Sequence, residues 1–298
     1  MITNVLSKAY TTVKQNFWSL VAMFLPTLVF SAFSGWLVPM LTNFDSIVVQ
    51  AMIGSVDLPS KLGGVFSLVL VLEIITFLLG TSFSFGLIIG LKDGKFRFKN
   101  AFAAFHGFTW LAVLGLYVVE VILLSLLVGF FAMVTIGFIV AAMKSWFFGI
   151  LAFIVAVLGV VCLVYVGLGL QFLFFTYFMD KDDDDTNFFD AFVTNWKLIK
   201  GYRWQLIGFI LMQFLIGLVL MVIAGLISGI IFAILAVMSN PGLRLVVAAI
   251  LGLIAVVIFL GAYVFYGLWS AVANAQFFLD LRDRKATTSQ PTAEESQD

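Results

Sequence analysis

QLIGFILMQFLIGLVLMVIAGLISGIIFAILAVM is the stretch from Gln205 to Met238, and it contains no charged residue. A helix needs about 20 mainly apolar residues to cross about 30 Å of membrane hydrocarbon, so this stretch is long enough to span a bilayer. The residues that follow, Ser239-Asn240-Pro241-Gly242, are typical of a turn, and a second apolar run extends from Leu245 to Leu279. The two runs predict a membrane-spanning helical hairpin.

The composition of the whole chain has the same character. Of its 298 residues, 63% are hydrophobic and 11% are charged, and its mean hydropathy is +1.15. Soluble domains have about 45–50% apolar and about 25% charged residues. This composition excludes a water-soluble enzyme, a disordered tail and a nucleic-acid binder, since a soluble chain has too little interior to bury so much apolar surface. It predicts an integral membrane protein.

Four further apolar runs are long enough to span the membrane. They extend from Phe17 to Leu41, Val65 to Leu91, Phe108 to about Met143, and Phe147 to Met179. Splitting the long runs into two spans each would put loops into hydrocarbon, where unpaired backbone groups are not tolerated. We therefore expect an all-α, polytopic membrane protein with six transmembrane helices.

The basic residues are distributed unevenly between the two sides that six spans would define. The side that holds both chain ends carries 13 of the 16 Lys and Arg residues, and the opposite side carries Lys61, Lys144 and Arg244. We call the first the basic side. Because loops rich in Lys and Arg stay in the cytoplasm, both termini are predicted to be cytoplasmic.

An alanine–aromatic pair recurs along the chain. Ala9-Tyr10, Ala101-Phe102 and Ala191-Phe192 are separated by 92 and 90 residues, and each precedes a span on the basic side. This spacing predicts three repeats, at residues 1–93, 94–180 and 186–280, each made of an amphipathic helix and a helical hairpin. The repeats would form one membrane domain over residues 1–281, followed by a polar cytoplasmic tail over residues 282–298.

The segments that precede the spans show helical amphipathicity. In the third, Phe192, Trp196 and Ile199 are expected on one face together with Phe188, whereas Asn195 is expected on another face. Four tryptophans are predicted as interfacial anchors: Trp18, Trp110, Trp196 and Trp204. Simple anchorage of the helix entry is the favoured reading, and lipid sensing or a docking collar is the alternative.

Two stretches resemble known families. LSKAYTTVKQNFWSLVAMFLP, residues 6–26, resembles the YciC-like family of bacterial inner-membrane proteins. DAFVTNWKLIKGYRWQLIGF, residues 190–209, is similar to the membrane domain of some glycerophosphodiester phosphodiesterases. The resemblance implies a six-span protein of the bacterial inner membrane. It transfers no functional residue, because the catalytic barrel of those phosphodiesterases has no counterpart here.

Few residues have the chemistry of a site. Glu73 and Glu120 are the ionisable residues deep within the expected spans. Each is either a carboxylate site for a proton, a cation or a substrate head, or a protonated acid bonded to a neighbouring helix. His106 is the single histidine, and Cys162 is the single cysteine. We expect no catalytic residue, no cofactor and no metal site, and we read the acidic stretch at residues 180–185 as a solvated linker.

Some small and polar residues within the spans are ambiguous. Gly86 and Gly90, and likewise Gly225 and Gly229, have the spacing that permits close packing of helices. The amides are Gln171, Gln213, Asn274 and Gln276, and they would either bond across the bundle or line a polar path.

Three functions stay open from the sequence. A structural or accessory protein of the bacterial envelope ranks first, a small-molecule or ion transporter using Glu120 and Glu73 second, and a membrane enzyme of lipid metabolism third. The expected partners are membrane lipids. A membrane-protein partner or a second copy of the chain is left open, and nucleic acid is excluded.

Overall fold

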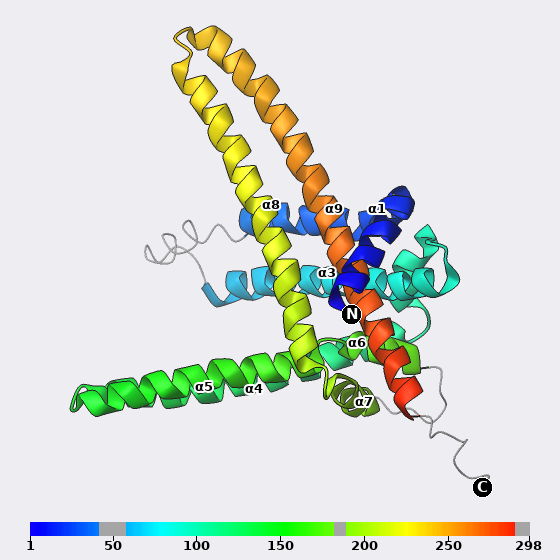
Figure 1. The fold of residues 1–298 in the computed structure, drawn as a ribbon. Coiled ribbons are helices and arrows are strands. Elements are labelled where there is room, and N and C mark those ends of the chain that lie inside the picture. Colours follow the sequence, from blue (N-terminus) through cyan, green and yellow to red (C-terminus); the bar gives the residue numbers. More distant parts are fainter. Residues whose placement is uncertain (42–57, 182–188, 290–298) are drawn as a thin grey trace. The chain divides into compact units, whose positions relative to one another are not determined.

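The structure confirms an all-α polytopic chain. The computed structural model describes residues 1–41, 58–181 and 189–289, and within these ranges every regular element is a helix (Figure 1). Six of the described helical segments are long and apolar enough to cross a membrane, in agreement with the six expected spans.

The helices follow the expected order along the chain. They are α1 (Ile2–Leu41), α3 (Leu58–Asp93), the 3₁₀ helix η1 (Phe98–Phe105), α4 (Thr109–Ala142), α5 (Trp146–Leu170), α6 (Leu173–Asp180), α7 (Asp190–Ile199), α8 (Arg203–Val237) and α9 (Pro241–Ser289). We refer to α1, α4 and α8 as outgoing helices. The return helices, which come back to the basic side, are α3, α5 with α6, and α9.

Two helix boundaries have details that the sequence did not predict. The run from Phe147 to Met179 is one candidate span, and within it Phe172, with φ −114° and ψ 20°, separates α5 from α6. The first residues of the segment 282–298 are helical, since α9 continues to Ser289. A helix can continue out of the apolar run because hydrocarbon is not required for its internal hydrogen bonds.

The chain divides into two compact units, each described here by itself. Unit 1 contains residues 1–21 and 201–283, and unit 2 contains residues 22–200 and 284–298. Unit 1 therefore includes the first part of α1 together with α8 and most of α9. Unit 2 includes the rest of α1 and the elements from α3 to α7.

In unit 1, α8 and α9 form a hairpin (Figure 1). The expected turn at residues 239–242 is confirmed. The Asn240 side chain accepts hydrogen bonds from the backbone N–H groups of Gly242 (3.0 Å) and Leu243 (3.2 Å). It thereby caps the first turn of α9, whose N–H groups lack partners within the helix. Towards the other end of the hairpin, Phe209 stacks on Phe277 with ring centroids 4.4 Å apart.

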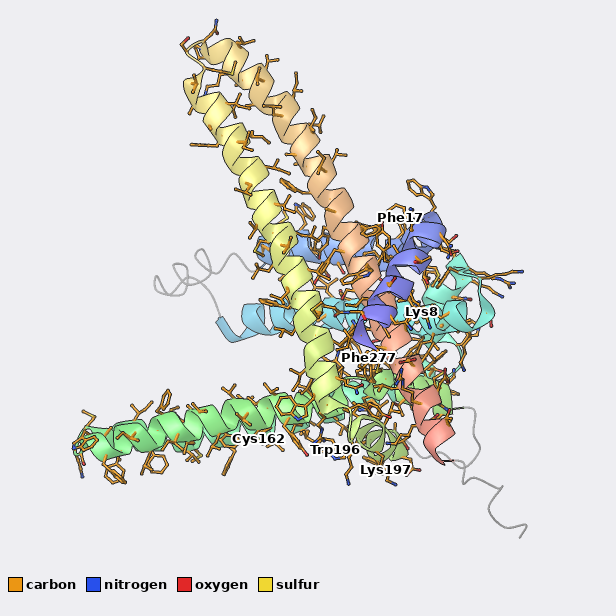
Figure 2. All side chains as sticks on the ribbon, viewed as in Figure 1. Lys8, Phe17, Cys162, Trp196, Lys197 and Phe277 are labelled. Atoms are coloured by element: carbon orange, nitrogen blue, oxygen red, sulfur yellow. The ribbon has the colours of Figure 1, made fainter. Side chains whose placement is uncertain are left out.

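In unit 2, α4 and α5 form a second hairpin, and α3 packs against η1, α4 and α6 (Figure 1). The buried core near the basic ends of these helices includes Leu78, Phe85 and Val113. Phe85 stacks on Phe178 of α6 with centroids 4.2 Å apart. By contrast, α4 and α5 expose large apolar side chains along most of their length, as Figure 2 shows. Such a surface is stable in lipid and not in water.

A short segment that ends in a backbone break comes before each outgoing span. In α1 this segment is the first part of the helix itself. We call residues 2–15, η1 and α7 the entry segments. The first ends at Asn16, which has φ −119° and ψ 22° inside α1. The other two end near Gly107 (φ +60°) and Gly201 (φ +93°). These positive φ values are readily adopted only by glycine, so the turns into α4 and α8 depend on it.

The small-residue spacing on α3 serves a different contact from the one expected. A Cβ atom on Gly86 would overlap the backbone carbonyl of Asn100 in η1, and one on Gly90 would overlap the ring of Phe96. Gly86 thus admits the crossing backbone of η1, and Gly90 admits the ring of Phe96. Gly225 and Gly229 have no atom of the described residues within 4 Å of an added Cβ.

We predict that Gly86→Val destabilises the protein by about 1–3 kcal/mol, because the added side chain must push η1 away from α3. Thermal unfolding in detergent should show a lowered Tm. Gly80→Ala, on the same helix and facing open space, is the control and should leave Tm unchanged or slightly raised. Equal Tm values for Gly86→Val and the unsubstituted protein would contradict this packing.

Candidate functional site

The first entry segment is fastened to α9 within unit 1. The indole Nε1 of Trp269 donates a hydrogen bond to the backbone carbonyl of Leu6 (3.2 Å). Nearer the end of α9, the Gln276 amide donates to the hydroxyl of Thr12 (3.1 Å). Ala9, between these two bonds, and Val13, just beyond the second, are fully buried. The interface is therefore an apolar stripe with a polar bond at each end.

The second entry segment, η1, is fastened to α3 within unit 2. The backbone N–H of Ala104 donates to the hydroxyl of Ser82 (2.9 Å), and both residues are fully buried. The alanines of η1 face the protein, whereas Phe98, Phe102 and Phe105 are exposed. The expected amphipathic helix is therefore a 3₁₀ helix whose small residues face the protein.

The third entry segment, α7, is fastened at the break between α5 and α6. The Asn195 amide donates to the carbonyl of Gly169 (2.6 Å), in the last turn of α5, where carbonyls lack partners within the helix. Asn195 also accepts a hydrogen bond from the hydroxyl of Thr176 on α6 (3.3 Å). Asn195 was expected on a face other than that of Phe192, Trp196 and Ile199, and the structure shows this side chain fully buried.

The alanine of each recurring pair is the contact residue. Ala9, Ala101 and Ala191 are 0%, 2% and 1% exposed. The breaks follow them at Asn16, Gly107 and Gly201, so the third interval is three to four residues longer than the others. About one extra helical turn in α7 accounts for the greater distance from Ala191 to Trp204 than from Ala9 to Trp18 or from Ala101 to Trp110.

Three of the four predicted anchors, Trp18, Trp110 and Trp204, are exposed just after the breaks, at the start of the outgoing helices. The fourth has a different environment. Trp196 packs over Gly169, with its ring edge-to-face to Tyr165 at a centroid distance of 5.6 Å. Trp196 and the exposed Lys197 are labelled in Figure 2. Trp196 therefore contributes to the packing of α7 on α5.

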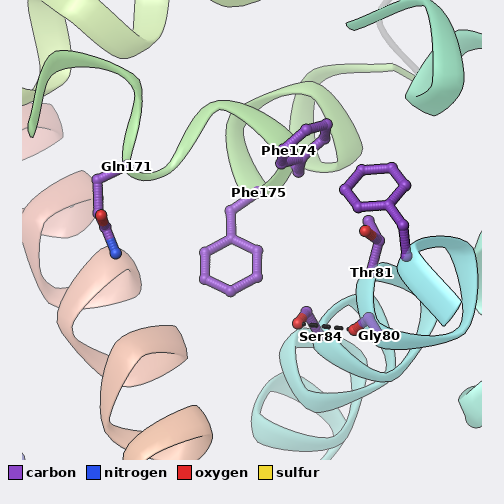
Figure 3. Close-up of a pocket in the computed structure, with 7 residues that line it drawn as sticks. Gly80, Thr81, Ser84, Gln171, Phe174 and Phe175 are labelled. Carbon is purple, nitrogen blue, oxygen red and sulfur yellow. Dashed lines mark hydrogen bonds between the residues drawn. The ribbon is translucent and has the colours of Figure 1, made fainter. Parts of the chain in front are cut away.

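A pocket opens between α3 and the α5–α6 break in unit 2. Its volume is about 300 Å³. It is lined by Phe77, Gly80, Thr81, Ser84, Gln171, Phe174 and Phe175, and Figure 3 shows these residues converging on it. The volume is at the lower end of the range for small-molecule sites, which are mostly apolar with a few convergent polar groups.

The polar groups of the pocket differ in their hydrogen bonding. The Ser84 hydroxyl donates to the carbonyl of Gly80 (3.0 Å; dashed in Figure 3). Thr81 is 8% exposed as a residue, and its side chain lines the pocket. A molecule that enters the pocket can therefore form a hydrogen bond with its hydroxyl.

Phe77 links this pocket to the predicted carboxylates. Its ring stacks on Tyr117 of α4 with centroids 4.1 Å apart and meets Phe174 of α6 edge-to-face at 5.4 Å. Glu73 precedes Phe77 by four residues, and Glu120 follows Tyr117 by three. Since residues three or four apart share a helix face, both carboxylates project from the faces that meet at this stack.

The two carboxylates therefore lie at one level, about one turn beyond the ring stack on the side away from the entry segments. Glu73 is exposed and Glu120 is half-buried. From the start of α4 at Thr109, the level of Glu120 is about 16 Å along the helix, near the middle of a bilayer. The pocket lies one turn to the other side of the stack, so its level is close to the start of α4.

Of the remaining amides, Gln213 makes a helix-to-helix contact and Asn274 bonds within its own helix. Gln213 of α8 is buried, and its side chain bonds to both the backbone and the hydroxyl of Ser270 on α9. Tyr266 donates to the carbonyl of Gln213 (2.9 Å). Asn274 bonds to its own helix at Ser270 (3.0 Å).

Sequence reasoning did not single out Thr81 and Ser84. The signal was present, because Thr81, Ser82 and Ser84 are three hydroxyl residues within four positions of an otherwise apolar span. Spacing alone does not show that Ser82 bonds to η1 while Thr81 and Ser84 face a pocket.

The other ionisable candidates form no site in the described part of the chain. His106 is exposed at the end of η1, and Cys162 is half-buried on α5. Within the described residues no cluster of three His, Cys, Asp or Glu side chains has the arrangement of a metal site. Most of the acidic stretch, residues 182–185, lies outside the described residues.

Comparisons with protein-family models, with curated proteins and with solved structures find no match to this chain.

We predict that cysteines at Glu73 and Glu120 can be joined by a short thiol cross-linker in a Cys162→Ser background, because the two positions lie at one level. The product is read by mass spectrometry of the digested protein. Pairing Glu73→Cys with Ile136→Cys is the control, since Ile136 lies about 24 Å further along α4 than Glu120. A control yield equal to that of the test pair would contradict the proposed register.

Proposed function

We propose that this protein is a non-enzymatic, accessory component of the bacterial cytoplasmic membrane, with its basic side and both termini in the cytoplasm. The observation that carries the proposal is the fastening of all three entry segments to return helices. Hydrogen bonds and buried alanines hold each segment beside a return helix. A surface built at the headgroup level suits contact with lipids better than passage of a substrate.

The outward faces of the entry segments have the chemistry of the lipid interface. Phe98, Phe102 and Phe105 of η1 are exposed, and so are lysines in each segment or beside it. These lysines are Lys8, Lys14, Lys95, Lys99, Lys197 and Lys200. Aromatic rings favour the headgroup level, and each basic residue near an anionic leaflet contributes about 1 kcal/mol to binding. We infer that anionic phospholipids are the partners of this surface.

The three repeats are part of the same proposal. An entry segment with a buried alanine, a backbone break, an exposed tryptophan and two long helical segments occur in this order around residues 1–93, 94–180 and 186–280. A triplicated unit would supply the cytoplasmic leaflet with three similar lipid contacts. The resemblance to the YciC-like family supports a place in the inner membrane and leaves the partner proteins undefined.

We predict that the double variant Lys197→Gln with Lys200→Gln retains less phosphatidylglycerol after purification in mild detergent, as counted by native mass spectrometry. Loss of about 1 kcal/mol per lysine corresponds to about fivefold weaker binding for each charge removed. Lys144→Gln, an exposed lysine on the opposite side, is the control and should retain the normal lipid complement. Unchanged phosphatidylglycerol in the double variant would overturn the lipid role of α7.

A second candidate, movement of a small solute across the membrane, is favoured by a separate observation. The pocket and the two carboxylates lie on opposite sides of one aromatic stack, Phe77 on Tyr117, within the same helices. A polar pocket followed by acidic groups near mid-membrane is the arrangement expected of a solute or cation route. Uptake of solute into proteoliposomes that Glu120→Gln abolishes would support this candidate, and uptake indifferent to that change would remove Glu120 from it.

A further inference from the structure

The pocket between α3 and the α5–α6 break is not explained by a lipid-binding surface on the entry segments. It lies inside unit 2, and Thr81, Ser84 and Gln171 present neutral polar groups to it. A cavity of about 300 Å³ with aromatic walls and a few polar groups has the composition of a small-molecule site.

The lining specifies the class of ligand. Three rings, Phe77, Phe174 and Phe175, form most of the wall, and no lining residue is ionisable. The Ser84 hydroxyl donates its proton to the carbonyl of Gly80, so the Ser84 oxygen can act only as an acceptor towards the pocket. The oxygens of Thr81 and Gln171 are further acceptors. Ring faces together with neutral acceptors recognise a cation of low hydration, an organic ammonium group above all.

The charges of the surrounding helices have the matching sign. Between residues 67 and 91 of α3, and along the whole of α4, the charged side chains are Glu73 and Glu120. Both lie about one helical turn beyond Phe77 and Tyr117, as the register of the stack requires. Lys181, which follows α6, donates to the Thr109 hydroxyl at the start of α4 (3.3 Å), so the negative field belongs to the level of the two carboxylates and of the ring stack.

The depth of the pocket defines where the ammonium group comes from. Thr81 lies one turn from Phe77 towards the basic side, so its level is about 6 Å inside the start of α4. Trp110 marks that start, and tryptophans favour the boundary between headgroups and acyl chains. A phospholipid headgroup and a small free amine both reach this level.

We propose that the pocket binds an organic ammonium group, carried either by a phospholipid headgroup or by a small free amine. The inference deepens the second candidate function and rests on it only for the fate of the ligand, since binding does not require transport. It is independent of the anionic-lipid surface, which lies on the outward faces of the entry segments.

The experiment uses the full-length protein in maltoside detergent and labelled choline in equilibrium dialysis. Choline should bind saturably, and its neutral isostere 3,3-dimethyl-1-butanol should compete at least about tenfold more weakly, because it lacks the charge that the rings recognise. Thr81→Val should weaken choline binding about tenfold, since it removes an oxygen that can accept from the choline hydroxyl and keeps the shape of the side chain.

Thr76→Val is the matched control. Its hydroxyl lies on the same helix, donates to the carbonyl of Leu72 (2.8 Å) and does not line the pocket. Choline affinity should be unchanged in this variant, and thermal unfolding of both variants verifies their folding. Equal competition by the neutral isostere would overturn the ammonium class, and choline binding unaffected by Thr81→Val would overturn the pocket.

A second arm distinguishes the two sources. Native mass spectrometry should show retained phosphatidylethanolamine that excess choline displaces and that Thr81→Val loses, if the ligand is a headgroup. Choline binding without any retained phosphatidylethanolamine identifies a free amine. The absence of both choline binding and retained phosphatidylethanolamine would overturn the proposal. Choline binding without uptake into proteoliposomes would refute transport alone and leave the site intact.

Discussion

Backbone hydrogen bonding in hydrocarbon is the constraint on which the rest of this structure depends. Spanning helices such as α8, with 35 residues, satisfy their backbone groups internally and can expose apolar side chains to lipid. Where a helix is interrupted, its freed carbonyls need another donor. The α5–α6 break meets this requirement, because Asn195 of α7 donates to Gly169 at the break. One buried amide thus connects the interruption of a span to the docking of an entry segment, and the same interruption brings Gln171 to the pocket.

The entry segments are attached by small residues and single polar bonds rather than by large apolar surfaces. Gly86 and Gly169 allow η1 and α7 to approach α3 and α5 closely, and a side chain at either position would overlap its neighbour. Ser82 and Asn195 then bond to groups that would otherwise be buried without partners. This arrangement leaves the larger aromatic rings of η1 and the lysines of α7 on the outer faces, where lipid headgroups can meet them.

The spans could be predicted from the sequence because uncharged runs of this length have one stable solution in a bilayer, and the turn at Asn240 is local chemistry. The buried alanines could be located from their recurrence. The break at Phe172 could not, since FLFFTYFMD contains no Pro or Gly to mark it, and Asn195, which bonds at the break, comes 23 residues later. The pocket could not be predicted for the same reason. The sequence does not show that Thr81 lines the pocket whereas Ser82 bonds to η1. Glu73 and Glu120 were found by their charge, but their common level required the stack between Phe77 and Tyr117.

We propose that the chain crosses the membrane six times with its three entry segments on the cytoplasmic side. Single cysteines placed at Lys8, Lys95, Ser145 and Asn240 in a Cys162→Ser background test this topology. A membrane-impermeant maleimide is applied to intact spheroplasts. Cysteines at Ser145 and Asn240, in the turns of the α4–α5 and α8–α9 hairpins, should be labelled from outside, and those at Lys8 and Lys95 only after the membrane is opened. Labelling of Lys8 or Lys95 in sealed spheroplasts would contradict the account.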